Sequence, residues 1–420
     1  MGMALGSMVA CAALALGSSA LAGGGVLVVD DDGGPGVDFT ELQPAIDAAA
    51  EGDVLLVRDG DYGGFTVQAK SLQIVADTGM PRVGSIAVRD LQPGQAVLLR
   101  GFRSAPVLAA AALELTNDLG PVWIEDCDLG QTASPPSIPV ALPGPGLRAA
   151  GCSGVALVRC QVRGGHAADT AGLPGLTVES SSVWLYDTRV DGADAFHEGA
   201  QNGPPGTGVL VESGFLWASG SHLEGGAGHP GGGGFPAASC TEFPAGPGGT
   251  GLYLVAGKVR LLDTDVLGGR GGEGAFGIPP GFCPDGPTGP EFVQDGGLFH
   301  EFAGEARSFM AGGPVREGES AMLSFRGEPG DAVFLLLALQ QSHEFRPELT
   351  GVLLLPEPPA ISLAGTIGAD GATLFAEIPV PDFGPGFCSL TVYAQSIHLE
   401  PGGALFLGPG SAVLVLDDGL

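Results

Sequence analysis

The densest group of titratable side chains in the sequence is the first place to look for chemistry. It consists of Asp187, Asp191, Asp194, His197 and Glu198. Carboxylates beside an imidazole are the residue types that general acid–base catalysis uses, and glycosidic cleavage in particular uses two carboxyl groups. A solvated loop at the root of an insertion explains the same composition. We therefore treat these five residues as catalytic candidates only if the protein is an enzyme.

Aromatic side chains form a second candidate site. All three tryptophans of the chain, Trp123, Trp184 and Trp217, occupy the same position of a repeated pattern. If that position faces outward, the indole rings form a strip on which sugar rings could stack. The alternative is that they pack beneath loops or against a second domain. Ligand binding by this strip is an expectation for the structure to test.

The pattern that positions these residues recurs five times, at residues 122–129, 146–165, 175–192, 208–226 and 251–269. Alternate residues are apolar in each copy, which is typical of strands that bury one face. A single coil cannot bury that face alone, whereas stacked coils can. A small residue follows at the next inward position and forms a predicted interior ladder: Cys127, Cys160, Thr188, Ser221 and Thr264.

Two outward columns of the same copies carry alternating charge. One column reads Asp126, Arg159, Asp187, Gly220 and Asp263, and the other reads Asp128, Gln161, Arg189, His222 and Asp265. Surface salt-bridge ladders are the expected arrangement. The alternative is a carboxylate cluster that binds Ca²⁺, which is the one cofactor these residues suggest. No metal site is otherwise indicated, because the acidic run at 30–34 lacks the spacing of a calcium-binding loop.

The opening of the chain indicates how the repeats begin. Residues 38–49 read as a short amphipathic helix, and apolar strands follow at 54–57, 65–67 and 72–76. This order resembles the N-terminal cap of right-handed parallel β-helix proteins of the pectin-lyase-like fold, over about residues 30–280. The resemblance implies an all-β chain: a right-handed parallel β-helix (solenoid) with a short N-terminal capping helix, at 23–302.

Three Gly/Pro-rich insertions interrupt the later repeats, at 193–207, 227–250 and 270–289. Long excursions of this kind are expected to leave a solenoid as flexible surface loops on one side. Cys240 and Cys283 lie in the last two insertions and are candidates for a disulfide. Cys127 and Cys160 are one strand spacing apart, within reach of a disulfide, although a reduced thiol stack is the favoured alternative.

The pattern changes near residue 303, where the Gly-Leu repeat stops and longer apolar strands begin. Residues 303–420 are predicted to form a C-terminal β-sandwich. The phrases at 368–372 and 390–395 resemble the C-terminal modules of secreted planctomycete-type proteins. The resemblance gives this domain no chemistry of its own.

The ends and the charge of the chain indicate its compartment and partners. Residues 1–22 combine an apolar core with Ala20-Leu21-Ala22, which predicts a signal peptide and a secreted or cell-surface protein, although the basic start of such signals is missing. No transmembrane segment is expected. A formal net charge of -30 makes nucleic acid an unlikely partner, whereas a polysaccharide or extracellular matrix is compatible with it.

These observations predict a non-catalytic extracellular or cell-surface β-helix protein that binds glycan or matrix. The first alternative is a polysaccharide lyase or glycoside hydrolase of the same fold, with carboxylates around Asp187 and an arginine such as Arg163 or Arg189. The catalytic sequence patterns of pectate-lyase-like and polygalacturonase-like enzymes are absent. The second alternative is a purely structural surface component or adhesin.

Overall fold

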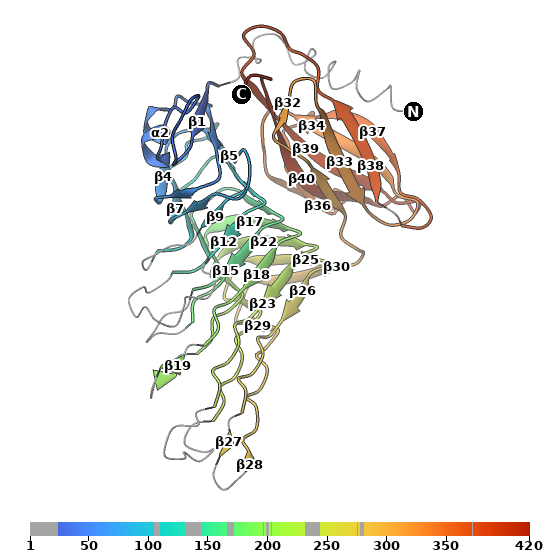
Figure 1. The fold of residues 1–420 in the computed structure, drawn as a ribbon. Coiled ribbons are helices and arrows are strands. Elements are labelled where there is room, and N and C mark those ends of the chain that lie inside the picture. Colours follow the sequence, from blue (N-terminus) through green and yellow to red (C-terminus); the bar gives the residue numbers. More distant parts are fainter. Residues whose placement is uncertain are drawn as a thin grey trace.

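The computed structural model describes residues 24–104, 110–130, 144–165, 172–195, 197–198, 201–202, 204–231, 244–274, 276–277, 281–371 and 373–420. Only the backbone is described for residues 197–198, 201–202, 276–277 and 281–282. The predicted signal segment lies outside these ranges. The described chain is mostly β, and long parallel sheets give it the arrangement of a parallel β-helix (Figure 1). None of its helices is long and apolar enough to cross a membrane.

Three parallel sheets form the solenoid, and the strands of successive coils pair side by side in each sheet. Sheet A contains β1 Val26–Val29, β2 Val54–Val57, β5 Leu72–Ala76, β8 Val97–Arg100, β11 Val122–Glu125, β14 Val155–Val158, β17 Ser181–Tyr186, β22 Gly214–Ser219, β25 Lys258–Leu262 and β30 Leu298–Phe302. Sheet B contains β3 Asp61–Tyr62, β6 Arg82–Val83, β9 Arg103–Ser104, β12 Asp128–Leu129, β15 Gln161–Arg163, β18 Arg189–Asp191, β23 His222–Glu224 and β26 Asp265–Leu267. Sheet C contains β4 Phe65–Gln68, β7 Ile86–Arg89, β10 Leu113–Thr116, β13 Leu147–Ala150, β16 Leu176–Glu179, β21 Val209–Val211, β24 Leu252–Leu254 and β29 Phe292–Gln294.

One short helix, α2 Leu42–Ala48, lies at the first coil. Its buried residues are Leu42, Ala45 and Ile46, which share one face and belong to the same core as the coils. Pro44 is in the first turn, where the missing N–H leaves no hydrogen bond unmade. The helix therefore covers apolar side chains that a first coil would otherwise expose.

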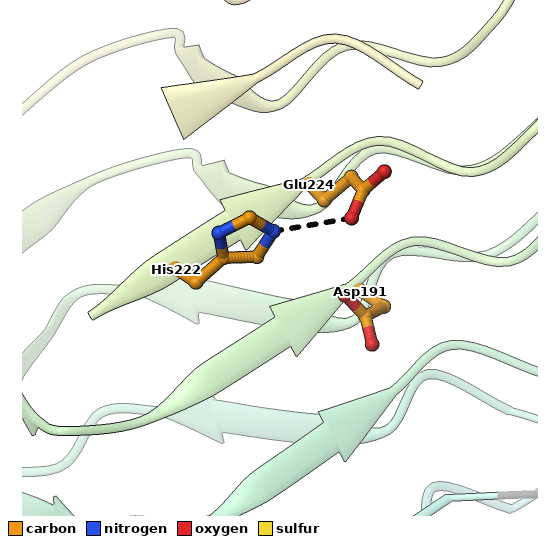
Figure 2. A group of neighbouring side chains, drawn as sticks. All are labelled: Asp191, His222 and Glu224. Carbon is orange, nitrogen blue, oxygen red and sulfur yellow. Dashed lines mark hydrogen bonds and ion pairs between the residues drawn. The ribbon is translucent and has the colours of Figure 1, made fainter. Parts of the chain in front are cut away.

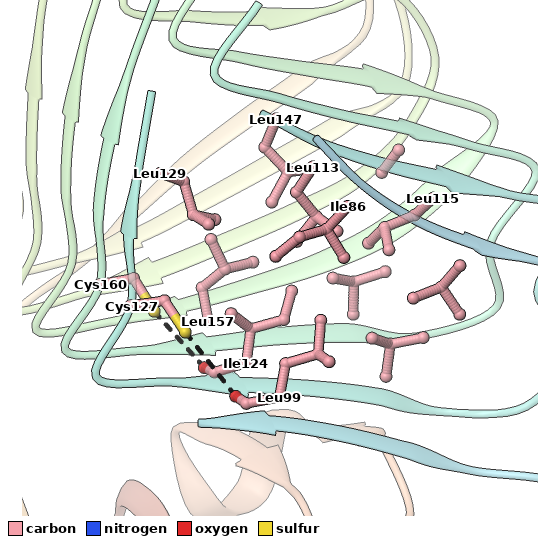
Figure 3. Packing of buried hydrophobic residues seen from close by; sticks show 14 of the residues in the cluster. Ile86, Leu99, Leu113, Leu115, Ile124, Cys127, Leu129, Leu147, Leu157 and Cys160 are labelled. Atoms are coloured by element: carbon pink, nitrogen blue, oxygen red, sulfur yellow. Dashed lines mark hydrogen bonds between the residues drawn. The ribbon is translucent and has the colours of Figure 1, made fainter. Parts of the chain in front are cut away.

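Apolar ladders fill the interior of the coils. Val122, Val155, Val183 and Leu216 are in register on neighbouring strands of sheet A and are all fully buried. Burial of such side chains stabilises the fold by about 1.5–3 kcal/mol each. Figure 3 shows this core from close by, with leucines and isoleucines of several coils in contact.

A small-residue ladder lies just past the bend between sheets A and B. Cys127 and Cys160 are buried free thiols of this ladder, and their sulfur atoms approach the carbonyl oxygens of Leu99 and Ile124 at 3.8 and 3.5 Å (Figure 3). The alternative of a disulfide between them is therefore not what the structure shows. Burial raises the pKa of the Cys160 thiol well above its usual value, so it is protonated and apolar.

The bend itself uses left-handed backbone. Asp126, Arg159, Asp187 and Asp263 have φ between 45° and 55°, and Gly220 has 59° in the same column. Asp and Gly tolerate this region better than most residues, because a short side chain or none avoids the steric clash. The column that alternates in charge is thus also the column that turns the chain from sheet A into sheet B.

The Gly/Pro-rich insertions are packed against each other wherever the structure describes them. Backbone hydrogen bonds of 2.8–2.9 Å connect Gly226 to Gly206, Gly249 to Gly226, Gly269 to Gly249, and Gly289 to Gly269. A Cβ at Gly226 would lie 1.7 Å from the carbonyl oxygen of Ala193, so no side chain fits there. We call these stacked segments (192–195, 204–208, 225–231, 244–251, 268–274 and 284–290) the glycine slab.

These segments contain no helix or strand, and hydrogen bonds join them to one another. In several of them glycines recur at every third position, as in Gly268, Gly271 and Gly274, which is the period of polyproline II. Two short hairpins lie farther out along the same arms (Figure 1): β19 His197–Glu198 with β20 Gln201–Asn202, and β27 Phe276–Gly277 with β28 Gly281–Phe282.

The C-terminal part begins with β31 and contains two larger sheets that enclose their own apolar core. One contains β31 Ser308–Ala311, β33 Ser320–Arg326 and β38 Leu374–Pro379. The other contains β32 Val315–Arg316, β34 Ala332–Ala338, β37 Ala360–Thr366, β39 Ser389–Leu399 and β40 Leu405–Leu416. A hairpin of β35 Glu344–Arg346 and β36 Gly351–Leu353 flanks the 3-10 helix η1 Pro347–Leu349.

Candidate functional site

The three tryptophans pair in the predicted register but are not exposed. Trp184 lies directly opposite Trp217 on β17 and β22, and the indoles of Trp123, Trp184 and Trp217 are 0%, 4% and 0% exposed. Aromatic rings of the C-terminal domain cover them: Tyr393 is 5.4 Å from Trp123, and Phe345 is 5.4 Å from Trp217, between ring centroids. The structure therefore shows the alternative, in which the tryptophans pack against a second domain, and not an exposed sugar-stacking strip.

The reason is that sheet A is apolar on both faces. The outward side chains of its strands form a second hydrophobic cluster with β34, β36 and β40 of the C-terminal domain. Strands such as β11 and β14 read Val-Trp-Ile-Glu and Val-Ala-Leu-Val, and all of their residues are buried. Near-continuous apolar runs are typical of strands covered on both sides, so the sequence did contain a signal for this junction.

A buried polar network crosses the same junction. Glu125 is fully buried on β11; its carboxylate accepts hydrogen bonds from Trp123 Nε1 at 3.0 Å and from the backbone N–H of Ala412 at 2.8 Å. Arg159 donates to Glu125 Oε1 at 2.5 Å and to the carbonyl oxygen of Phe309 at 3.1 Å. Arg100 donates to the carbonyl oxygens of Ala311 and Ala412. Each of these charged groups thus has a partner of opposite charge, and both guanidinium groups also donate hydrogen bonds to backbone carbonyl oxygens of the C-terminal domain.

The acidic residues that the sequence grouped as catalytic candidates lie in different parts of the structure and have different partners. Asp187 is half-buried at the junction, where its carboxylate accepts a 3.0 Å hydrogen bond from Ser308 Oγ; desolvation raises the pKa of Asp187 despite this bond. Asp191 lies on sheet B, and Asp194 accepts a 2.7 Å bond from the backbone N–H of Ala227 in the glycine slab. The side chains of His197 and Glu198 lie outside the described part of the structure.

Sheet B carries the charge ladder that its outward column predicts. Asp128 is paired with Arg103 at 3.4 Å and with Arg163 at 2.8 Å. Arg189 is paired with Asp191 at 2.8 Å and with Glu224 at 2.6 Å. These side chains are partly exposed, so each pair contributes at most about 1 kcal/mol.

Asp191, His222 and Glu224 are close enough to be considered as metal ligands (Figure 2). One ligand atom from each lies within 4.8 Å of the others, and His222 Nε2 is 3.1 Å from Glu224 Oε2. However, the Arg189 guanidinium contacts both carboxylates, and a fixed positive charge there opposes a metal cation. The arrangement is an ion-pair ladder, and it gives no support to the Ca²⁺ alternative.

A polar groove lies between the first coils and the C-terminal domain. It has a volume of about 900 Å³. The solenoid wall carries Glu51, Asp53, Gln73, Gln95 and Ser153, and the opposite wall carries Gln340, Gln341, His343, Ser389 and Thr391. Leu119, which is 55% exposed, adds an apolar rim. The groove has the size of a small-ligand site, and its lining is more polar than that of most such sites.

The polar groups of this groove differ in what they already bind. Both carboxylate oxygens of Asp53 accept 2.7 Å hydrogen bonds, from the backbone N–H groups of Gly25 and Ala50. Gln341 donates to the carbonyl oxygen of Val97 at 3.3 Å, whereas its own Oε1 has no hydrogen-bond partner and the residue is 8% exposed. Burial lowers the pKa of His343 to about 4, so this imidazole is neutral near pH 7.

The remaining cysteine candidates are only partly described. Cys283 is disulfide-bonded, and Cys240 lies outside the described residues, so the pairing of these two stays a prediction.

The sequence did not predict the groove, because its walls come from segments far apart in the chain.

Comparison with known proteins adds no family to these observations. No family model matches the sequence, and no curated protein is significantly similar to it.

Proposed function

We propose that this chain is an exported, non-catalytic extracellular or cell-surface protein, a right-handed parallel β-helix of the pectin-lyase-like fold with a C-terminal β-sandwich, that binds glycan. The observation that carries the proposal is the polar groove where the two domains meet. It offers amide and hydroxyl groups together with apolar surface, the combination that sugar hydroxyls and sugar C–H faces require.

The engagement of the acidic side chains supports a non-catalytic role. Glycosidic cleavage needs two carboxyl groups that face one substrate bond. Here Asp187 accepts a hydrogen bond from Ser308 at the junction, and Asp191 forms an ion pair with Arg189. Asp194 accepts a hydrogen bond from a backbone N–H group of the glycine slab. Each of these carboxylates has a structural partner in a different place.

The C-terminal domain acts as a brace in this proposal, not as a detached attachment module. Its β34, β36 and β40 share an apolar cluster with sheet A, and Arg100 and Arg159 bind its backbone. A rigid connection of this kind keeps the groove between the two domains preformed, which lowers the entropy cost of binding.

The test is to incubate residues 23–420 with a panel of polysaccharides, with and without Ca²⁺, and to measure both binding and release of reducing or unsaturated ends. We expect binding to at least one neutral member and cleavage of none. Cleavage of any member would establish an enzyme and overturn the proposal. Failure to bind any member would favour the purely structural alternative.

A further inference from the structure

The groove between the first coils and the C-terminal domain has walls that are chemically unlike those of a site for ions. Its described lining residues include two acidic side chains, Glu51 and Asp53, and no lysine or arginine. With a formal net charge of -30 on the whole chain, an anionic polymer would be repelled from this surface. Anionic ligands are therefore poor candidates.

The two carboxylates are equally poor ligands for a cation. Both oxygens of Asp53 are bound by backbone N–H groups. Glu51 Oε1 accepts hydrogen bonds from the backbone N–H of Ser71 at 3.0 Å and from Gln95 Nε2 at 3.1 Å. Burial raises the pKa of Glu51 and these hydrogen bonds lower it, with a net shift below its usual value. Hard cations prefer several free oxygen ligands, and these carboxylates shape the wall instead.

Beside apolar residues such as Leu119 and Leu390, the lining is rich in neutral polar groups. Gln73, Gln95, Gln340 and Gln341 supply amides, and the hydroxyls are those of Ser71, Ser153, Ser342, Ser389 and Thr391. Gln341 is also a lining residue, and its buried Oε1 atom accepts no hydrogen bond. An acceptor in this state is satisfied by a ligand that brings an O–H or N–H group.

Contacts across the domain boundary hold the two walls in place. Thr391 on β39 donates to Gln73 on β5, and Ser389 Oγ donates to the carbonyl oxygen of Gly24 at 3.3 Å. Gln341 itself reaches from the C-terminal domain to Val97 on β8. Neither domain alone would present this surface.

From these observations we propose that the groove binds an uncharged saccharide, with Gln341 Oε1 as an acceptor for a ligand hydroxyl and Leu119 beside a sugar ring face. The inference rests on the proposed function and makes it more specific. It names neutral glycans as the ligand class and excludes a Ca²⁺ requirement.

The experiment uses residues 23–420 and isothermal titration with soluble neutral oligosaccharides (gluco-, xylo- and manno-oligosaccharides) and with oligogalacturonate as the anionic probe. Ser153→Trp and Gln340→Trp block the groove from opposite walls, and both wild-type side chains are exposed, so the fold tolerates the change. Gln341→Leu removes the unpaired acceptor. Gln68→Trp, exposed on β4 of sheet C, is the matched control. Thermal unfolding of each variant verifies the fold.

We expect a neutral probe to bind equally with EGTA and with Ca²⁺, both tryptophan blockers to weaken binding at least about tenfold, and the control to stay within about twofold. Gln341→Leu is expected to weaken binding about tenfold. Binding that survives both blockers would overturn the groove assignment while leaving glycan binding intact. Stronger binding of oligogalacturonate would overturn the ligand class. No binding of any probe to the wild type would overturn both the inference and the proposed function.

Discussion

Two outer faces of the same solenoid carry arginine–carboxylate pairs, and they differ in what covers them. On sheet A, Glu125 is 0% exposed and lies with Arg100 and Arg159 beneath the C-terminal domain. On sheet B, Arg189 and Glu224 form a pair of similar length that stays partly exposed. Arginine–carboxylate pairs thus connect the two domains on sheet A and remain at the solvent-exposed surface on sheet B.

The difference teaches that burial, and not the number of ion pairs, sets the energetic weight of a charge. An exposed pair is screened by water and contributes little. The attraction within a buried pair offsets the cost of desolvation only if its remaining donors and acceptors are also hydrogen-bonded. For Glu125, these further hydrogen bonds come from Ser411, Ala412 and Trp123. Removal of one partner then leaves the others unpaired in an apolar environment.

The sharpest test of this contrast is Glu125→Ala. We expect a loss of about 3–5 kcal/mol in the free energy of unfolding. Trp123 Nε1 and the backbone N–H of Ala412 would lose their buried acceptor. Arg100 and Arg159 would keep only the partly exposed Asp126 as a carboxylate partner. Urea denaturation of residues 23–420 measures it. The matched control is Glu224→Ala on sheet B, which should cost at most about 1 kcal/mol. Equal costs for the two substitutions would refute the contrast.

The apolar part of the junction gives the next largest effect. Leu336 on β34 is 4% exposed and packs in the cluster shared with sheet A, whereas Leu363 on β37 is 52% exposed. We expect Leu336→Ala to cost about 2–4 kcal/mol through lost burial and a residual cavity. Leu363→Ala should stay within about 0.5 kcal/mol. A separate early unfolding transition of the C-terminal domain in the wild type would show that the junction is weaker than we infer.

Acidification should strain the junction through His343. Burial lowers the pKa of His343 from 6.5 to about 4. Between these pH values the unfolded chain binds a proton at this imidazole and the folded chain does not. The contribution of His343 is therefore fully present above pH 6.5 and is lost as the pH falls toward 4, by about 3 kcal/mol. Denaturation midpoints measured between these pH values should fall less steeply in His343→Gln. An unchanged slope would mean that the folded protein protonates this imidazole freely.

Two other buried groups contribute to the same pH profile and are unchanged in the variant. Burial lowers the pKa of His398 to about 4, which adds a loss of the same sign. Burial raises the pKa of Asp118 to about 6, so its contribution improves as the pH falls through 6. The difference between wild type and variant isolates His343.

The smallest effect is expected on the exposed ladder. Arg189→Met removes the guanidinium that bridges Asp191 and Glu224, and we expect a change within about 1 kcal/mol. The change should shrink further in high salt, because exposed ion pairs are screened. A loss comparable to that of Glu125→Ala, measured by the same denaturation, would contradict the view that sheet B is only a surface.

The sequence predicted the coils better than their surroundings. The column of Trp123, Ala156, Trp184, Trp217 and Arg260 is the observed register of sheet A, because a period of two fixes which residues face inward once the strands stack. What the outward residues meet is not periodic. It depends on a domain that begins far along the chain, and the near-continuous apolar character of strands such as β14 is the signal that indicated it.

The candidate site was largely beyond sequence reasoning. Asp187, Asp191 and Asp194 are close in sequence, which suggested that they act together. In the solenoid, Asp187 lies at the bend after sheet A and Asp191 lies on sheet B, so neighbours in sequence belong to different faces. Conversely, Gln73 and Thr391 are distant in sequence and in contact across the domain boundary. Glutamines and serines of this kind carry no pattern that marks them as a site.

The glycine slab has a consequence for how this protein can change over evolutionary time. Its segments are bonded to each other by glycines that recur every three residues, and the last described segment places Pro284, Pro287 and Pro290 in the same period between them. An insertion of one or two residues would bring a Cβ to a position where a neighbouring backbone lies closer than 3 Å. Within the slab we therefore expect a tolerated insertion or deletion to come in steps of three residues, which in a polyproline II conformation is one turn of about 9 Å.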